Sequence, residues 1–153
     1  MSPSMRLPIN GIPFLAYICL PMTIKKIILY IEDDEDDYLL LSQAFQRFED
    51  RFTLIHAKNA AAGMDILKGA PFDHFPCIVL LDMNIPLIDG KQTLLKIKEE
   101  FPVIDVILFS TSMEIRDGDF ALANGAEFIS KPRDYEGWMH IADCLVERQT
   151  ENN

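Results

Sequence analysis

The chain has 153 residues, of which 49% are hydrophobic and 25% charged. These proportions are typical of one soluble globular domain that can bury a core. The 24 acidic residues exceed the 14 basic ones and give a formal net charge of -10, which repels nucleic-acid backbones. Nucleic-acid binding is therefore not expected. Three widely spaced cysteines, with no Cys-x-x-Cys pair and no histidine cluster beside them, do not support a zinc site and fit a reducing cytoplasm.

Residues 1–22 differ in composition from the rest of the chain. They hold four prolines and a single charge, Arg6, with an apolar run from Phe14 to Leu20. The run is too short to span a membrane, and neither a basic start nor a small-residue cleavage site marks a signal peptide. We expect residues 1–22 to be an extension outside the fold, residues 23–149 to form one domain and residues 150–153 to be a tail. The alternative is that the extension packs on an exposed face or a partner.

Beyond the extension, strand and helix patterns alternate. Apolar, β-branched runs predict strands at Ile27–Ile31, Phe52–Ala57, Ile78–Asp82, Val106–Ser110 and Glu127–Ser130. Apolar residues at steps of three and four predict helices between and after them: Tyr38 to Phe48, Ala60 to Leu67 with Asn59 as N-cap, Lys91 to Glu100, Glu114 to Asn124 ended by Gly125, and a last helix marked by Trp138, Ile141 and Leu145. Five strands alternating with five helices predict an α/β fold, a doubly wound parallel sheet covered on both faces.

The third predicted strand delivers a carboxylate to a loop. Four apolar residues run into Asp82, and a loop with Asn84, Pro86 and the pair Asp89-Gly90 follows. Proline fixes φ, and we expect the Asp-Gly pair to adopt left-handed backbone before the next helix. Because ligands collect at the carboxyl edge of a parallel sheet, Asp82 is a candidate functional residue rather than only a turn cap.

Polar groups follow the other strands at the same edge. Glu32 and Asp33 follow the first strand, Ser110 ends the fourth and Lys131 follows the fifth. Three carboxylates in one pocket raise each other's pKa unless a cation lies among them. Carboxylate oxygens, with a backbone carbonyl from the loop at Asn84, are ligands that suit Mg²⁺.

Such a pocket is suited to phosphoryl chemistry. Asp82 can attack phosphorus while the metal and the Lys131 ammonium neutralise charge on the phosphoryl oxygens. We expect Ser110 to donate a hydrogen bond to one of those oxygens. Its loop would then move inward and leave space for Phe128, three residues before Lys131, to turn in.

These motifs resemble the receiver domain of bacterial two-component response regulators. The resemblance rests on the acidic pair after the first strand, Asp-Met-Asn-Ile-Pro-Leu-Ile-Asp-Gly at positions 82–90, the hydroxyl after the fourth strand and Lys131-Pro132. It covers about Thr23 to Gln149. The flavodoxin-like strand order 2-1-3-4-5 is carried over from this family.

The resemblance implies a role for each site residue. Asp82 matches the phosphoacceptor, Ser110 the conformational-switch hydroxyl, Lys131 the phosphate-binding lysine and Phe128 the switch aromatic, where tyrosine is common. The implied Mg²⁺ ligands are Glu32, Asp33, Asp82 and the backbone carbonyl of Asn84. Glu32 is one methylene longer than the aspartate often found there, and a cis peptide is expected at Lys131-Pro132. The chain also resembles the small receivers that accompany phytochrome-type kinases.

The family further implies a cytoplasmic signalling protein that is not an enzyme beyond catalysing its own phosphorylation and dephosphorylation. Its expected partners are a sensor histidine kinase or a histidine phosphotransfer protein, with a phosphorylation-dependent homodimer as a further expectation. Because the last predicted helix ends near position 149, output is expected through binding, at the face of the fourth helix, fifth strand and fifth helix.

Two alternatives remain open at this point. A haloacid-dehalogenase-type phosphatase also uses a strand-end aspartate and Mg²⁺, and Asp34-Glu35-Asp36 imitates its motif. Such enzymes usually need a longer chain and a cap, and that reading leaves the Asp82 loop unexplained. The second alternative is a receiver-like module that binds partners without phosphorylation. Outside the phosphatase alternative, the acids from Asp34 to Asp37 are interpreted as solvated charge at a helix start rather than as metal ligands.

Overall fold

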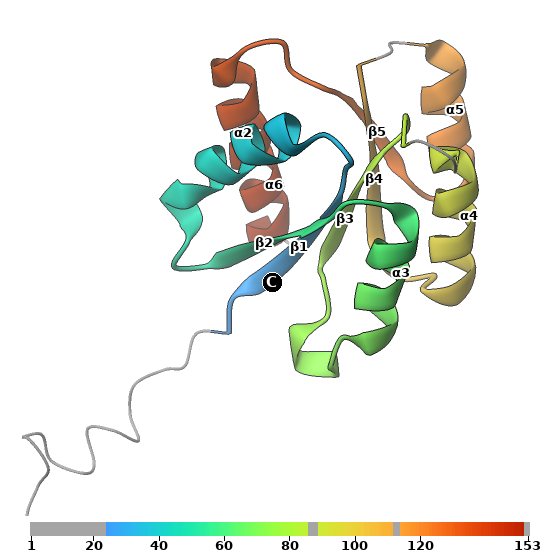
Figure 1. Ribbon diagram of the computed structural model, residues 1–153, viewed down its shortest axis with the longest axis horizontal. Coiled ribbons are helices and arrows are strands. Elements are labelled where there is room, and N and C mark those ends of the chain that lie inside the picture. Colours follow the sequence, from blue (N-terminus) through green and yellow to red (C-terminus); the bar gives the residue numbers. More distant parts are fainter. Residues whose placement is uncertain (1–23, 86–88, 112–113, 152–153) are drawn as a thin grey trace, which may run out of the picture.

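The structure is a computed structural model that describes residues 24–85, 89–111 and 114–151. Five strands form one parallel sheet in the order β2-β1-β3-β4-β5 (Figure 1). Their bounds are Lys26–Ile31 (β1), Phe52–Ala57 (β2), Ile78–Asp82 (β3), Asp105–Ser110 (β4) and Glu127–Ser130 (β5). The predicted doubly wound, flavodoxin-like fold is confirmed, including the strand order.

The described residues contain five α-helices, as predicted: Glu35–Phe45 (α2), Ala60–Gly69 (α3), Gly90–Glu100 (α4), Ile115–Ala123 (α5) and Tyr135–Glu151 (α6). Short 3-10 helices cover Gln46–Phe48 and Phe72–His74, so the first predicted helix ends in a tighter turn. The predicted tail begins within α6. Gln149 is buried there, and its carbonyl accepts a 2.5 Å hydrogen bond from Lys26 Nζ. Within the described ranges, no helix is both long and apolar enough to cross a bilayer.

The helices cover the sheet on both faces, with α2 and α6 on one and α3, α4 and α5 on the other (Figure 1). Strand β1 shows how the sequence serves both layers. Ile28 and Tyr30 pack in the core under α2 and α6, whereas Leu29 and Ile31 pack in the core on the opposite face. Because side chains alternate along a strand, a continuous apolar run is what a doubly covered strand needs.

Side-chain caps fix where three helices begin. Asp34 caps α2 by accepting from the backbone N–H groups of Asp36 and Asp37. Asn59 caps α3, as predicted, by accepting from Ala62 N at 2.8 Å, and Asp89 caps α4. Each cap follows a strand or its loop, so the helices start at the carboxyl edge of the sheet.

Candidate functional site

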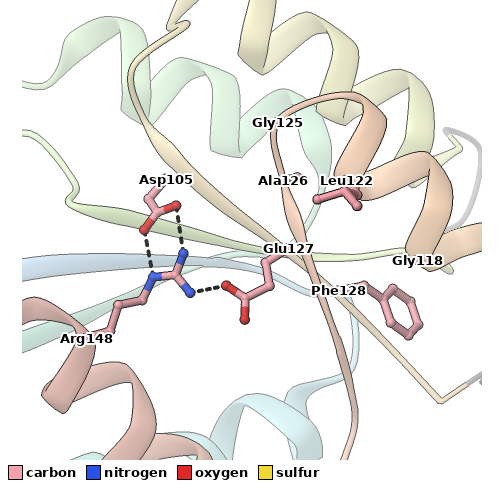
Figure 2. Close-up of a pocket in the computed structure, with 8 residues that line it drawn as sticks. All are labelled: Asp105, Gly118, Leu122, Gly125, Ala126, Glu127, Phe128 and Arg148. Atoms are coloured by element: carbon pink, nitrogen blue, oxygen red, sulfur yellow. Dashed lines mark hydrogen bonds and ion pairs between the residues drawn. The ribbon is translucent and has the colours of Figure 1, made fainter.

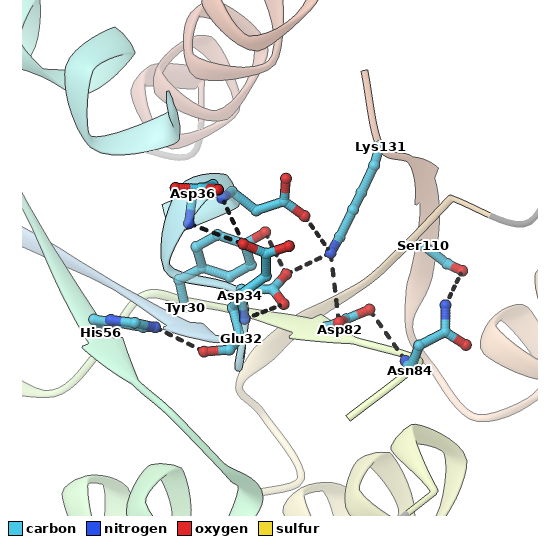
Figure 3. A network of polar contacts seen from close by, with 10 residues as sticks. Tyr30, Glu32, Asp34, Asp36, His56, Asp82, Asn84, Ser110 and Lys131 are labelled. Carbon is cyan, nitrogen blue, oxygen red and sulfur yellow. Dashed lines mark hydrogen bonds and ion pairs between the residues drawn. The ribbon is translucent and has the colours of Figure 1, made fainter. Parts of the chain in front are cut away.

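The carboxyl ends of four strands bring the predicted polar residues to one edge (Figure 3). Glu32 follows β1, Asp82 ends β3, Ser110 ends β4 and Lys131 follows β5. All four are buried, with exposed fractions of 0%, 3%, 1% and 9% in that order. The backbone N–H of Lys131 donates to the Ser110 carbonyl at 2.8 Å, so pairing of β4 with β5 continues into the site.

The ammonium of Lys131 lies among three carboxylates. Its Nζ is 2.5 Å from Glu32 Oε2, 2.8 Å from Asp37 Oδ2 and 3.4 Å from Asp82 Oδ2. An ammonium group carries three donors, so each carboxylate can receive one. The lysine therefore links α2, β1 and β3 from its position after β5.

The Glu32 side chain is held by further donors. Its Oε2 also accepts from the hydroxyl of Tyr30 at 2.8 Å, and its Oε1 accepts from the Asp34 N–H at 3.1 Å. Its backbone carbonyl lies 2.7 Å from Nε2 of His56, whose ring stacks on Tyr38 at 4.0 Å. The acid after β1 is thus fixed by groups from β1, β2 and the start of α2.

Burial acts against charge on both members of the Lys131–Glu32 pair. It raises the pKa of Glu32, and the hydrogen bond from Lys131 only partly offsets this. Burial also opposes charge on Lys131, but hydrogen bonds to Asp37 and Glu32 and the nearby Asp82 outweigh it and raise its pKa. The raised pKa of Glu32 favours its neutral form, whereas the raised pKa of Lys131 favours its charged form. Because three carboxylates surround this one ammonium, Lys131 stays charged.

The acids outnumber the cation. Glu32, Asp33 and Asp82 each offer an oxygen within 4.8 Å of the others, and Asp33 is exposed while the other two are buried. Hard oxygen ligands from carboxylates suit a divalent cation such as Mg²⁺, and the exposed Asp33 leaves the group open to solvent. The acid cluster therefore fits a divalent metal.

Asn84 connects the ends of β3 and β4. Its backbone N–H donates to Asp82 Oδ1 at 3.1 Å, and its side-chain Nδ2 donates to Ser110 Oγ at 3.4 Å (Figure 3). The loop thus positions both the carboxylate and the hydroxyl. Metal ligation by the Asn84 carbonyl stays a prediction, and the proposed role of Pro86 lies outside the described residues.

Glycine is required at position 90 for a reason other than the left-handed backbone predicted from the sequence. It is the first residue of α4, and among the described glycines only Gly125 has a positive φ, of 68°. A Cβ at Gly90 would lie 2.7 Å from the Met83 Cα and 2.8 Å from the Asp82 carbonyl oxygen. The expected left-handed turn at Asp89-Gly90 is therefore wrong, and glycine is required because α4 starts against the backbone of the Asp82 loop.

The structure also bears on the expected cis peptide bond and on the predicted switch aromatic. Within the described residues no peptide bond is cis, so the expected cis bond at Lys131-Pro132 is wrong; the trans form is intrinsically favoured by about 0.5–1 kcal/mol. Phe128 is half-buried in a groove with Gly118 and Leu122 of α5, and Figure 2 shows its ring directed toward α5. Its switch role stays a prediction.

Sequence reasoning missed two members of the site. Tyr30 lies in the strand predicted at Ile27–Ile31 and is buried there, but its hydroxyl also binds Glu32. Asp37 was interpreted as solvated charge, yet its carboxylate contacts Lys131. Tyr30 carried a usable signal, since a buried tyrosine hydroxyl normally finds a partner and the nearest acid is two residues away.

Comparisons with known proteins agree with this architecture. The family described as "Response regulator receiver domain" matches residues 28–142. The chain is 30% identical over 126 residues to the probable methanogenesis regulatory protein FilR2 of Methanothrix harundinacea (strain 6Ac), covering 79% of this chain and 81% of that protein.

Two solved structures share the fold. The phosphorylated cyanobacterial phytochrome response regulator RcpA superposes with a TM-score of 0.72 at 23% identity, covering 80% of this chain and 92% of that one. The Mn²⁺-bound form of response regulator Rcp1 gives 0.68 at 24% identity, covering 78% and 91%. The family match spans most of the residues that build the sheet and its acidic edge, and the chain belongs to the response regulator receiver domain family.

Proposed function

We propose that this receiver domain accepts one phosphoryl group on Asp82 from a phosphohistidine of a sensor kinase or a phosphotransfer protein. The observation that carries the proposal is the setting of the Asp82 carboxylate. One oxygen accepts from Asn84 N–H, the other lies 3.4 Å from the Lys131 ammonium, and Asp82 offers one oxygen to the group of acids that fits a divalent cation. The family is phosphorylated by such donors and binds Mg²⁺ at an acidic pocket.

The transfer exchanges one bond for another. A lone pair on an Asp82 carboxylate oxygen attacks phosphorus, the P–N bond to the donor imidazole breaks, and that nitrogen keeps the electron pair. Lys131 donates to a phosphoryl oxygen, and Asn84 N–H holds the carboxylate in place during attack. Glu32, Asp33, Asp82 and the Asn84 carbonyl would hold Mg²⁺, which would supply charge neutralisation at the phosphoryl oxygens when bound.

Output is proposed to follow from the site's connection to the α5–β5–α6 face. Ser110 lies at the end of β4 and accepts from Asn84, so a phosphoryl group on Asp82 offers its hydroxyl a new acceptor. Phe128 of β5 lines an open groove of ≈ 580 Å³ between α5 and α6 (Figure 2). We propose that the Ser110 and Phe128 side chains rearrange together and change what this face binds.

The test is phosphoryl incorporation, followed by intact mass spectrometry in Mg²⁺ with acetyl phosphate as the small donor. The wild type is expected to gain one phosphoryl group, and Asp82→Asn none. Asp65→Asn, which removes one exposed negative charge on α3, is the matched control and should label normally. Full labelling of Asp82→Asn would overturn the proposal.

The same measurement addresses the phosphatase alternative. That mechanism needs Asp34 as nucleophile, whereas the structure uses the Asp34 carboxylate to cap α2. Asp34→Asn should therefore keep phosphoryl incorporation. Loss of labelling in Asp34→Asn, with labelling retained in Asp82→Asn, is the outcome that favours the phosphatase.

A further inference from the structure

The Lys131 ammonium has partners of two kinds. Within the described residues, the carboxylates in ion-pair distance of its Nζ are Glu32, Asp37 and Asp82. Glu32 and Asp82 belong, with Asp33, to the acids that can share one cation, and Asp37 is not in that group. A cation bound there interacts with Glu32 and Asp82, two of these three carboxylates, and repels the ammonium. Of the three, only Asp37 then remains to hold Lys131.

Asp37 is well placed for this task. It lies in the first turn of α2, where a negative side chain is favoured next to exposed N–H groups, and that turn is fixed by the Asp34 cap. Its side chain is 24% exposed, against 6% for that of Lys131, so the contact is largely shielded from solvent. Helix α2 also packs against α6, which follows Lys131 in the chain (Figure 1).

We infer that Asp37 is a positioning residue that keeps the Lys131 ammonium beside Asp82 when a divalent cation occupies the acidic pocket. This inference rests on the proposed function, because it assigns Asp37 to the same site. Without Asp37, Lys131 relies on Glu32 and Asp82 alone and competes with the cation for them. The lysine and the metal then exclude each other, whereas with Asp37 both can remain.

The test compares two neighbouring variants by calorimetric titration of metal-free protein with Mg²⁺. Asp37→Asn and Asp36→Asn each remove one negative charge from the first turn of α2, but Asp36 is exposed and is not among the partners of Lys131. We expect Asp37→Asn to weaken Mg²⁺ binding by roughly five- to tenfold, within the range of measured pair couplings, and Asp36→Asn by about twofold or less. Asp37→Glu should restore part of the affinity.

A second background separates positioning from simple loss of charge. In Lys131→Met, Asp37 has no ammonium to hold, so adding Asp37→Asn should change Mg²⁺ affinity no more than adding Asp36→Asn does. The inference fails if the two single variants bind Mg²⁺ equally, or if the Asp37→Asn effect persists in full without the lysine. Circular dichroism melting confirms that each variant is folded; if Lys131→Met is not, the single-variant comparison and the Asp37→Glu rescue still decide.

Failure of this inference and failure of the proposed function give different results. If the wild type binds Mg²⁺ and is labelled at Asp82 while Asp37→Asn matches Asp36→Asn, only the role of Asp37 is wrong. If the wild type binds no Mg²⁺ and is not labelled, the proposed function itself is wrong.

Discussion

Two charge clusters lie at opposite edges of the sheet, one at the carboxyl ends of its strands and one at their amino ends. After the carboxyl end of β5, Lys131 meets Glu32 and Asp82, with side-chain exposures of 6%, 0% and 5%. At the amino ends of β4 and β5, Arg148 of α6 meets Asp105 and Glu127 (Figure 2), with exposures of 32%, 34% and 49%. Each cluster joins one cation to acids from different elements, but only Lys131, Glu32 and Asp82 are buried from water.

The difference distinguishes the proposed phosphorylation site from an ion-pair cluster that joins elements of the fold. Arg148 makes a bidentate contact with Asp105, with Nε–Oδ2 and Nη2–Oδ1 distances of 2.9 and 3.2 Å, and also contacts Glu127. Water screens these charges, so the cluster is complete without another ion. The buried cluster holds more carboxylates than its one ammonium can neutralise, and a divalent cation can neutralise this excess negative charge.

The largest expected effect is on stability in metal-free buffer. Lys131→Met leaves buried carboxylates without their cation and should lower the free energy of unfolding by about 3 kcal/mol. Arg148→Met removes a partly exposed contact and should cost no more than about 1 kcal/mol. Urea unfolding in EDTA measures both. Equal costs would show that burial does not distinguish the clusters.

The sequence alone predicted the sheet whose opposite edges carry these two clusters. The strands Phe52–Ala57, Ile78–Asp82 and Glu127–Ser130 were predicted with the observed bounds, because each apolar run ends at polar residues or a turn. The Asn59 cap was also correct, since its side chain acts within its own turn. The convergence of Asp82, Ser110 and Lys131 followed from the parallel sheet alone.

Contacts between distant side chains could not be derived in this way. The ion pair of Asp37 with Lys131 joins residues 94 positions apart, and it depends on how α2 is tilted over the sheet. Periodicity says only that Asp37 starts a helix. The reason for Gly90 was also hidden, because a close approach to the Asp82 backbone and a left-handed turn both call for glycine.

A smaller effect is expected from pH. Burial raises the pKa of Glu32 above its ordinary value of 4.5, so the folded protein keeps this proton to higher pH than the unfolded chain. The associated stability is present below that ordinary value and is lost as pH rises through the folded pKa. In EDTA, the stability of the wild type relative to Glu32→Gln should therefore decrease from acid to neutral pH in urea titrations. A relative gain for the wild type over that range would contradict the raised pKa.

The smallest effect is expected at the exposed cluster and concerns its response to salt. A double-mutant cycle with Arg148→Met and Asp105→Asn should give a coupling of about 0.5–1 kcal/mol at low ionic strength, as for other partly exposed ion pairs. At about 1 M salt the screening length falls to roughly 3 Å, so most of this coupling should disappear. The Lys131–Glu32 coupling, measured through Lys131→Met and Glu32→Gln, should keep most of its value because neither side chain meets bulk ions. If both couplings fall together, salt screens Lys131 as it screens Arg148, and burial does not distinguish the two clusters.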